Sequence, residues 1–181
     1  MKFNKLEILN LVGYQISDIN KLEKVNFNEL KKLNLGGNNI SDIKVLEKIK
    51  FNKLEILCLS CNQISDINIL KNVNFKELKE LYLANNKILD IKVLEKVKFN
   101  KLEILNLDGN QILDINILEK INFKELKALN LGGNNISDIK VLKKVKFNKL
   151  EKLDLERNKI SKNENATIIS KLKLKIKEFY I

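Results

Sequence analysis

Phenylalanine recurs in this sequence at a constant interval of 24 residues. The members of the series are Phe3, Phe27, Phe51, Phe75, Phe99, Phe123 and Phe147. A repeat period of about 20–50 residues indicates a solenoid, because one unit of this length cannot bury its apolar side chains and must stack on its neighbours. The sequence therefore predicts a stack of seven 24-residue units over residues 3–170.

Two hydrophobic spacings alternate within each unit. In the fifth unit, Leu105 and Leu107 are two residues apart, which places both on one face of a short strand. The next apolar residues, Ile115, Leu118 and Ile121, are three apart, which is the spacing of one face of a short α or 3-10 turn. Each unit is therefore expected to form one coil, with a strand on one side and a helical turn on the other. The strands of successive coils would build a parallel sheet.

The consensus of the units is L-x-x-L-x-L-x-x-N-x-I, as in Leu102, Leu105, Leu107, Asn110 and Ile112. This string resembles the leucine-rich repeat. The variant N-x-I-x-D-I-x-x-L is similar to the subclass found in phosphatase-regulating subunits and in bacterial internalins. The resemblance covers nearly the whole chain in seven successive copies. It implies an α/β solenoid, a right-handed horseshoe with a parallel β-sheet on its concave side and short α or 3-10 helices on its convex side.

Two polar positions are nearly constant among the units. Asparagine fills the ninth consensus position at Asn38, Asn62, Asn86, Asn110, Asn134 and Asn158. A side-chain amide both donates and accepts hydrogen bonds, so we expect it to satisfy backbone groups of adjacent coils. The first unit has Tyr14 there, where no preceding coil exists to be bridged. Aspartate precedes the helical turn in six units, as Asp90 and Asp114 do, and is predicted to be the N-cap residue.

The two ends of the array differ. After the seventh unit, residues 163–172 are predicted to form a longer helix capped by Asn or Ser, and Ile176, Phe179 and Ile181 repeat the strand spacing. We therefore expect a capping helix and an eighth strand over about residues 163–181, within a single repeat domain over residues 1–181. No such device precedes Phe3, which leaves the N-terminal edge open. Either the chain is a fragment of a longer array or this edge meets a partner.

The outward positions of the expected strands and bends vary most in the third to fifth units, which contain an aromatic ring, two thiols and both charge signs. Tyr82 is interpreted as the only Tyr or Phe at an outward strand position, and aromatic anchors dominate many interfaces. Ile56 and Ile104 are placed in register on the adjacent coils, so we expect the three to form an apolar patch. The predicted partner-binding residues are Ile56, Cys58, Glu80, Tyr82, Asn85, Lys87, Ile104, Asn106 and Asp108.

The net charge of +11 does not by itself indicate a nucleic-acid site. The predicted concave positions carry five basic and four acidic residues, so most of the excess charge lies elsewhere. The chain has one arginine, Arg157, whereas specific recognition of phosphates and bases favours arginine. We therefore expect no specific nucleic-acid binding. No apolar run approaches the roughly 20 residues of a membrane span, so we expect no membrane insertion.

Histidine, the commonest general base and metal ligand, is absent, and cysteine is scarce. The chain has no His, and its two cysteines form the single motif Cys58-Leu-Ser-Cys61. A structural zinc site takes four ligands, and a redox C-x-x-C pair favours a helix N-terminus. We interpret the pair as two small residues at repeat positions, with an interchain metal site or a reversible disulfide as the alternative. With neither a phosphate-binding loop nor a catalytic carboxylate pair, we predict a protein that is not an enzyme and uses no metal or cofactor.

These features predict a protein–protein interaction scaffold that binds another protein, of unknown identity, on its concave face. The alternatives are a structural spacer or fragment of a longer repeat array, and a basic module that binds polyanions. The first residues contain no signal-peptide apolar region, and the cysteines are sparse, so a cytoplasmic location is expected. We expect a monomer, with the open N-terminal edge as the place for any association.

Overall fold

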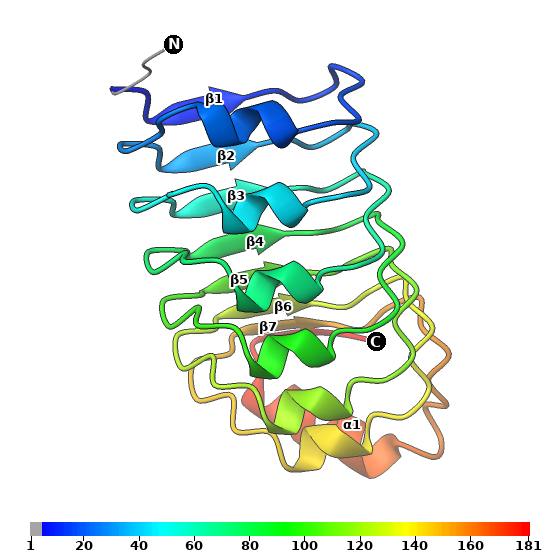
Figure 1. Cartoon of the computed structure of the whole chain (residues 1–181). Helices are drawn as coiled ribbons and strands as arrows, with labels where there is room; N and C mark the ends of the chain where they lie inside the picture. Colours follow the sequence, from blue (N-terminus) through cyan, green and yellow to red (C-terminus); the bar gives the residue numbers. More distant parts are fainter. Residues whose placement is uncertain (1–4) are drawn as a thin grey trace.

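The computed structural model describes residues 5–181, so the prediction for Phe3 lies outside the described residues. A parallel sheet runs along one side of the molecule, and short helices run along the opposite side (Figure 1). Within the described residues the sheet has eight strands in sequence order. They are β1 Ile8–Asn10, β2 Lys32–Asn34, β3 Ile56–Cys58, β4 Glu80–Tyr82, β5 Ile104–Asn106, β6 Ala128–Asn130, β7 Lys152–Asp154 and β8 Glu178–Tyr180. The repeat solenoid predicted from the sequence is confirmed.

The register of the sheet follows the sequence period. From β1 to β7, each residue pairs with the residue 24 positions later, as Leu57 does with Leu81 and Leu81 with Leu105. The central leucine of each strand from β2 to β7 points into the coil and is fully buried, and the two flanking residues point to the opposite face. Between β7 and β8 the pairing advances by 26 residues, from Leu153 to Phe179. Two inserted residues are therefore absorbed between the last two strands.

Within residues 5–181, six 3-10 helices lie opposite the strands. They are η1 Asn20–Lys24, η2 Lys44–Glu47, η3 Asn68–Lys71, η4 Lys92–Glu95, η5 Asn116–Glu119 and η6 Lys140–Lys143. The aspartate before each helix accepts a hydrogen bond from the first helical N–H, as Asp114 Oδ1 does from Asn116 at 2.7 Å. The prediction that this aspartate is the N-cap residue is wrong by one position. Ile115 occupies the N-cap, and the Asp114 side chain reaches past it to the helix.

The phenylalanine series forms a buried spine along most of the array. Phe51, Phe75 and Phe99 are at most 2% exposed. The ring centroids of Phe51 and Phe75 are 5.9 Å apart, and those of Phe75 and Phe99 are 6.3 Å apart, within the range that aromatic pairs favour. The predicted stacking from coil to coil is confirmed there. Phe147 is only half buried, so the spine opens toward its C-terminal end.

The recurrent asparagines bridge adjacent coils. Asn110 is 6% exposed, and its Nδ2 donates to the carbonyl oxygens of Leu83 in the preceding coil and Leu107 in its own coil, both at 3.0 Å. Its Oδ1 accepts a hydrogen bond from the backbone N–H of Ile88, also at 3.0 Å. The same set of contacts recurs at Asn38, Asn62, Asn86, Asn134 and Asn158. The predicted bridging role is therefore confirmed, and Tyr14, at this position of the first coil, is exposed.

Lysine–glutamate pairs join equivalent positions of successive coils. Glu and Lys alternate from coil to coil at one position, so that the Nζ of Lys31 lies 2.9 Å from Glu7 and the Nζ of Lys79 lies 2.7 Å from Glu55. Two residues earlier the alternation has the opposite phase, as in the pair of Lys53 with Glu29. Each exposed pair of this kind contributes little to stability, because solvent screens the charges. Their alternation nevertheless makes the structural unit a pair of coils, because two coils of the same type would face each other with like charges.

The C-terminal segment forms α1 Ala166–Lys175 and then β8. α1 packs against η6 and β8 at the end of the stack (Figure 1). The predicted side-chain cap is wrong. Asn165 occupies the N-cap position, but its Nδ2 donates to the carbonyl oxygen of Ser161 at 2.9 Å, and no side chain caps the first turn.

Candidate functional site

The nine predicted site residues lie together on three adjacent coils. Six of them form two rows across β3, β4 and β5, namely Ile56, Glu80 and Ile104, then Cys58, Tyr82 and Asn106. These six side chains and Asp108 are half buried, whereas Asn85 and Lys87, at the bend after β4, are exposed. The seven half-buried residues thus form a strip of apolar and polar side chains, and the exposed Asn85 and Lys87 form its polar margin.

Tyr82 lies in the middle of this strip, and its hydroxyl is held by a neighbour on the same strand. Its Oη donates a hydrogen bond to Glu80 Oε2 at 2.7 Å. Burial, followed by this hydrogen bond and the negative charge of Glu80, raises the pKa of Tyr82 to about 12. The side chain is therefore a neutral phenol whose hydroxyl is directed toward Glu80. Ile56 and Ile104 are in register with Glu80, so they are diagonal neighbours of Tyr82 and not members of its row.

A second tyrosine also faces outward. Tyr180 on β8 is 40% exposed, and its Oη donates to Glu178 at 3.3 Å, repeating the Glu-x-Tyr arrangement of β4. Lys152 Nζ lies 5.3 Å from the centroid of the Tyr180 ring, within cation–π range. The interpretation that Tyr82 alone occupies such a position is therefore wrong. The Glu-x-Tyr string common to both strands is the sequence signal for this second outward tyrosine.

Asp108 has a partner that sequence reasoning missed. Its Oδ1 lies 2.8 Å from Nη2 of Arg157, two coils further along the array. A side chain at Gly132, on the coil between them, would place its Cβ 2.7 Å from Asp108 Oδ1. The missing side chain at Gly132 therefore leaves room for the ion pair. The lone arginine of the chain, one coil beyond a Gly-Gly bend, is the only signal of this contact in the sequence.

Some of the predicted residues also stabilise the local backbone. Asn106 Oδ1 accepts a hydrogen bond from the backbone N–H of Asp108 at 3.0 Å, which fixes the orientation of the side-chain amide. Asn85 Nδ2 lies 3.7 Å from Cys61 Sγ, and Lys87 Nζ lies 3.4 Å from Gln63 Oε1. The margin of the strip is therefore tied from coil to coil by weak polar contacts.

Cys58 and Cys61 are both free thiols. Cys58 is half buried on the outward face of β3, whereas Cys61 is exposed at the bend, with a φ of 56° that favours glycine. Over residues 5–181, no group of three or more His, Cys, Asp or Glu side chains is arranged to hold a metal ion. This part of the chain also contains no helix long and apolar enough to cross a bilayer.

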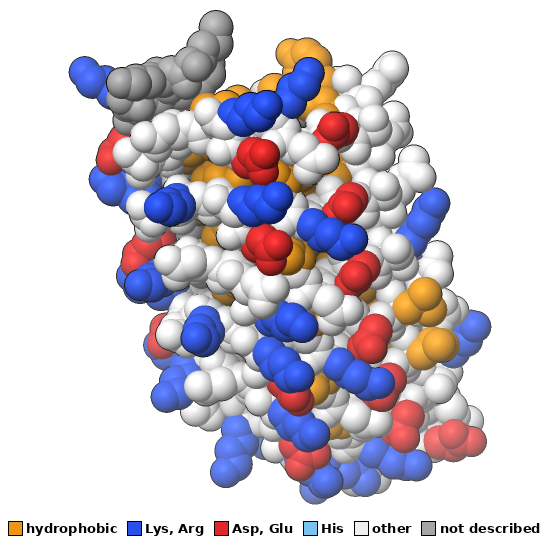
Figure 2. All heavy atoms as spheres, viewed as in Figure 1, with side chains coloured by type: hydrophobic (Ala, Val, Ile, Leu, Met, Phe, Trp, Pro, Cys, Tyr) orange, Lys and Arg blue, Asp and Glu red, His pale blue; other side chains and the backbone are white. Residues whose placement is uncertain are grey.

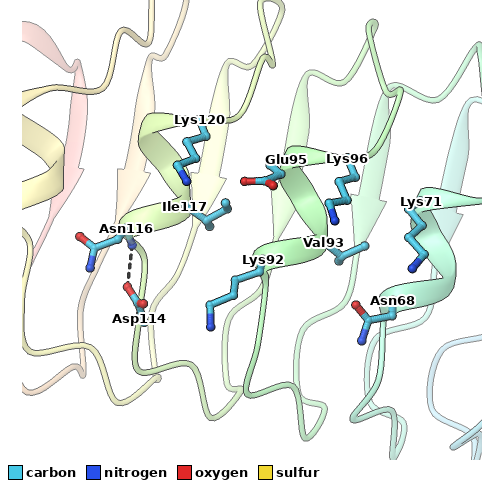
Figure 3. Close-up of a pocket in the computed structure, with 10 residues that line it drawn as sticks. All are labelled: Asn68, Lys71, Lys92, Val93, Glu95, Lys96, Asp114, Asn116, Ile117 and Lys120. Atoms are coloured by element: carbon cyan, nitrogen blue, oxygen red, sulfur yellow. Dashed lines mark hydrogen bonds between the residues drawn. The ribbon is translucent and has the colours of Figure 1, made fainter.

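The helix-bearing face carries basic and acidic side chains in a mixed pattern (Figure 2). A hollow of about 410 Å³ on this face lies across η3, η4 and η5, and its lysines are Lys71, Lys92, Lys96 and Lys120. Their side chains extend side by side and do not converge on one point, while the Asp114 carboxylate accepts the hydrogen bond from Asn116 (Figure 3). The hollow therefore lacks the convergent donors of a specific anion site.

Sequence models of leucine-rich repeats match the central part of the chain. A model described as Leucine Rich repeats (2 copies) matches residues 28–72 and 76–120, and a model described as Leucine Rich repeat matches residues 125–139. Among curated protein sequences, none matches this chain.

Solved structures share the fold. Internalin C2 from Listeria monocytogenes is 28% identical, with a TM-score of 0.71, and the match covers 87% of this chain and 65% of that one. An internalin (inlF) from the same organism is 28% identical, with a TM-score of 0.66, over 92% of this chain and 51% of that one. The LRR ectodomain of the plant membrane receptor kinase GASSHO1/SCHENGEN3 from Arabidopsis thaliana, in complex with CASPARIAN STRIP INTEGRITY FACTOR 2, is 26% identical, with a TM-score of 0.62, over 80% and 17%.

This chain therefore spans less than two thirds of the length of each of these structures. The matching models together span more than half of it, and the repeat, the parallel sheet and the bridging asparagines agree with them. The chain belongs to the leucine-rich repeat family.

Proposed function

We propose that this chain is a non-enzymatic scaffold that binds another protein on the outward face of its sheet, with β3, β4 and β5 at the centre. The observation that carries the proposal is the strip around Tyr82, where one aromatic and two aliphatic side chains lie among carboxylates, an amide and a thiol. Interfaces commonly combine a few apolar or aromatic anchors with a polar margin. The strip has this composition.

The rigidity of the surface supports the same function. The strands beneath the strip are continuously paired from β1 to β8, so their outward side chains are held at fixed spacings. The hydrogen bond from Tyr82 to Glu80 restricts the Tyr82 ring before any partner arrives. Less side-chain entropy is then lost on binding than for a freely rotating tyrosine.

The relatives support a binding role in general terms. The receptor kinase ectodomain, which shares this fold, has been solved in complex with CASPARIAN STRIP INTEGRITY FACTOR 2. We infer from the shared architecture that this chain also presents a binding surface, and from its own residues that the surface includes Tyr82. The partner we propose is a second protein, bound by a monomer of this chain.

The test compares a double variant in the strip with a charge variant on the opposite face. Tyr82→Ala with Ile104→Lys removes the anchor and introduces a charge beside it, and Lys96→Glu changes the helix-bearing face. Each protein is used as bait in a lysate of the source organism, and the retained protein is then purified and titrated against all three baits. We expect wild type and Lys96→Glu to bind with equal affinity and the double variant to lose binding.

Thermal unfolding of the three baits is the control for folding, because both strip side chains are only half buried. Normal binding by the double variant, or a loss confined to Lys96→Glu, would show that the partner does not use the strip.

A further inference from the structure

A cavity of about 510 Å³ lies where α1 meets the last repeat, away from the strip. Its floor is apolar and comes from two segments, with Val145 and Phe147 from the chain after η6 and Ile168 and Leu172 from α1. Phe147 is half buried, whereas the equivalent Phe99 is 2% exposed. Apolar surface that the inner coils cover is therefore accessible here.

The cavity exists because the repeat is interrupted at this point. Each repeat has its phenylalanine three residues before the first leucine of the strand motif, as Phe147 precedes Leu150. The eighth strand motif begins at Ile176, and Lys173 stands three residues before it. No ring follows Phe147 in the spine, and the ten-residue α1 replaces the four-residue 3-10 helix of the preceding coil.

The rim of the cavity is strongly basic. Its lining includes Lys143, Lys144, Lys146, Lys171 and Lys175 and no carboxylate. Lys144 lies 3.4 Å from Glu119, which lines the adjacent hollow, and Glu125 in that hollow is paired with Lys149. In the described part of the chain the other four rim lysines form no ion pair. The cavity thus combines an apolar lining with four lysines that form no ion pair within residues 5–181.

We propose that this cavity binds an anionic amphiphile, a single-chain molecule with a carboxylate or phosphate head. The apolar chain packs against Phe147 and Leu172, and the head lies among Lys146, Lys171 and their neighbours. The volume falls within the roughly 300–1,000 Å³ of small-molecule sites. Charge complementarity favours an anion and disfavours a second copy of this chain, whose net charge is +11.

The test is a calorimetric titration of the full chain with octanoate, decanoate and dodecanoate, each below its micelle concentration. We expect one saturable site and an affinity that rises about tenfold for each two added carbons, because each buried methylene contributes to binding. The uncharged 1-decanol is expected to bind at least about tenfold more weakly than decanoate, because it leaves the rim lysines without a counter-charge.

Two double variants separate the site from general charge attraction. Lys146→Glu with Lys171→Glu places carboxylates at the rim and is expected to weaken decanoate binding at least about tenfold. Lys50→Glu with Lys98→Glu makes the same change in net charge, and both of its lysines are exposed at the repeat position equivalent to Lys146. That control is expected to change the affinity less than about twofold.

Equal losses in the two double variants would overturn the proposal, as would the absence of saturable decanoate binding. The proposal would also be overturned if phosphatidylglycerol vesicles or an acidic amphipathic peptide bound at this rim and free decanoate did not. None of these results depends on the strip around Tyr82, so the two proposals stand or fall separately.

Discussion

Replacement of Asn110 by alanine measures how strongly the asparagine ladder stabilises the array. The variant loses the bonds that Nδ2 donates to the carbonyl oxygens of Leu83, Leu107 and Asp108, and the bond that Oδ1 accepts from the N–H of Ile88. Each of these carbonyls keeps a second bond from another residue. The backbone N–H of Ile88 loses its acceptor, Asn110 Oδ1, at a position that is buried from water.

The expected loss of stability follows from the bonds that are lost and from the buried N–H that is left unsatisfied. Two net hydrogen bonds contribute about 0.5–1.5 kcal/mol each, and an unsatisfied buried N–H costs about 1–3 kcal/mol. We expect Asn110→Ala to lower the free energy of unfolding by about 2–6 kcal/mol. Asn158 makes the same contacts on the last repeat but is half buried, so water can replace part of them. Asn158→Ala is expected to cost about 1–2 kcal/mol.

Asn110→Asp separates the donor role of the side chain from its acceptor role. The carboxyl group at position 110 can still accept from the Ile88 N–H, but when ionised it faces the oxygens of Leu83 and Leu107 without a proton to donate. We expect the pKa of this carboxyl in the folded state to lie above its unfolded value. A raised folded-state pKa gives stability that is present at low pH and lost as the pH rises. Asn110→Asp is therefore expected to gain stability relative to Asn110→Ala as the pH falls.

The assay is urea unfolding followed by circular dichroism, at neutral and at acidic pH, with all variants compared at each pH. An Asn110→Ala cost below about 1 kcal/mol would refute the reasoning, because it would mean that relaxation or water restores the Ile88 contact. Equal costs for Asn110→Ala and Asn158→Ala would show that burial does not set the strength of the ladder. A pH-independent difference between Asn110→Asp and Asn110→Ala would refute the proposed donor role.

Three further outcomes are expected. Cys61→Gly should raise the free energy of unfolding, measured in urea, by about 0.5–1 kcal/mol, because glycine relieves the strain of a φ of 56°. The control Ser60→Gly, at the neighbouring residue, should lower that free energy, and equal effects of the two changes would contradict the strain at Cys61. Phe99→Ala should lower the free energy of unfolding by about 3–5 kcal/mol, and a near-neutral result would be incompatible with a buried spine. The hydrogen bond from Lys127 lowers the pKa of Glu103, so the NMR titration of this carboxyl should shift to higher pH in Lys127→Met, and an unchanged pKa would mean that the pair does not form in solution.

The sequence by itself determined the architecture, because a strict 24-residue translation gives each inner coil the same neighbours. Leu81, Leu105 and Phe99 could be assigned to the core from their spacing, and Asn110 to a bridge between coils from its recurrence. Outward residues of adjacent coils must also lie beside one another in a parallel stack. The predicted strip from β3 to β5 therefore lies on one surface of the sheet.

The tertiary structure decided the contacts that do not repeat. The pair of Asp108 and Arg157 spans two coils and depends on the missing side chain at Gly132. The half-exposed Phe147 and its basic rim depend on how α1 leaves the last repeat. Periodicity carries no information about either feature, because each arises where one coil differs from its neighbours. Side-chain length and the path of the backbone then determine which atoms meet.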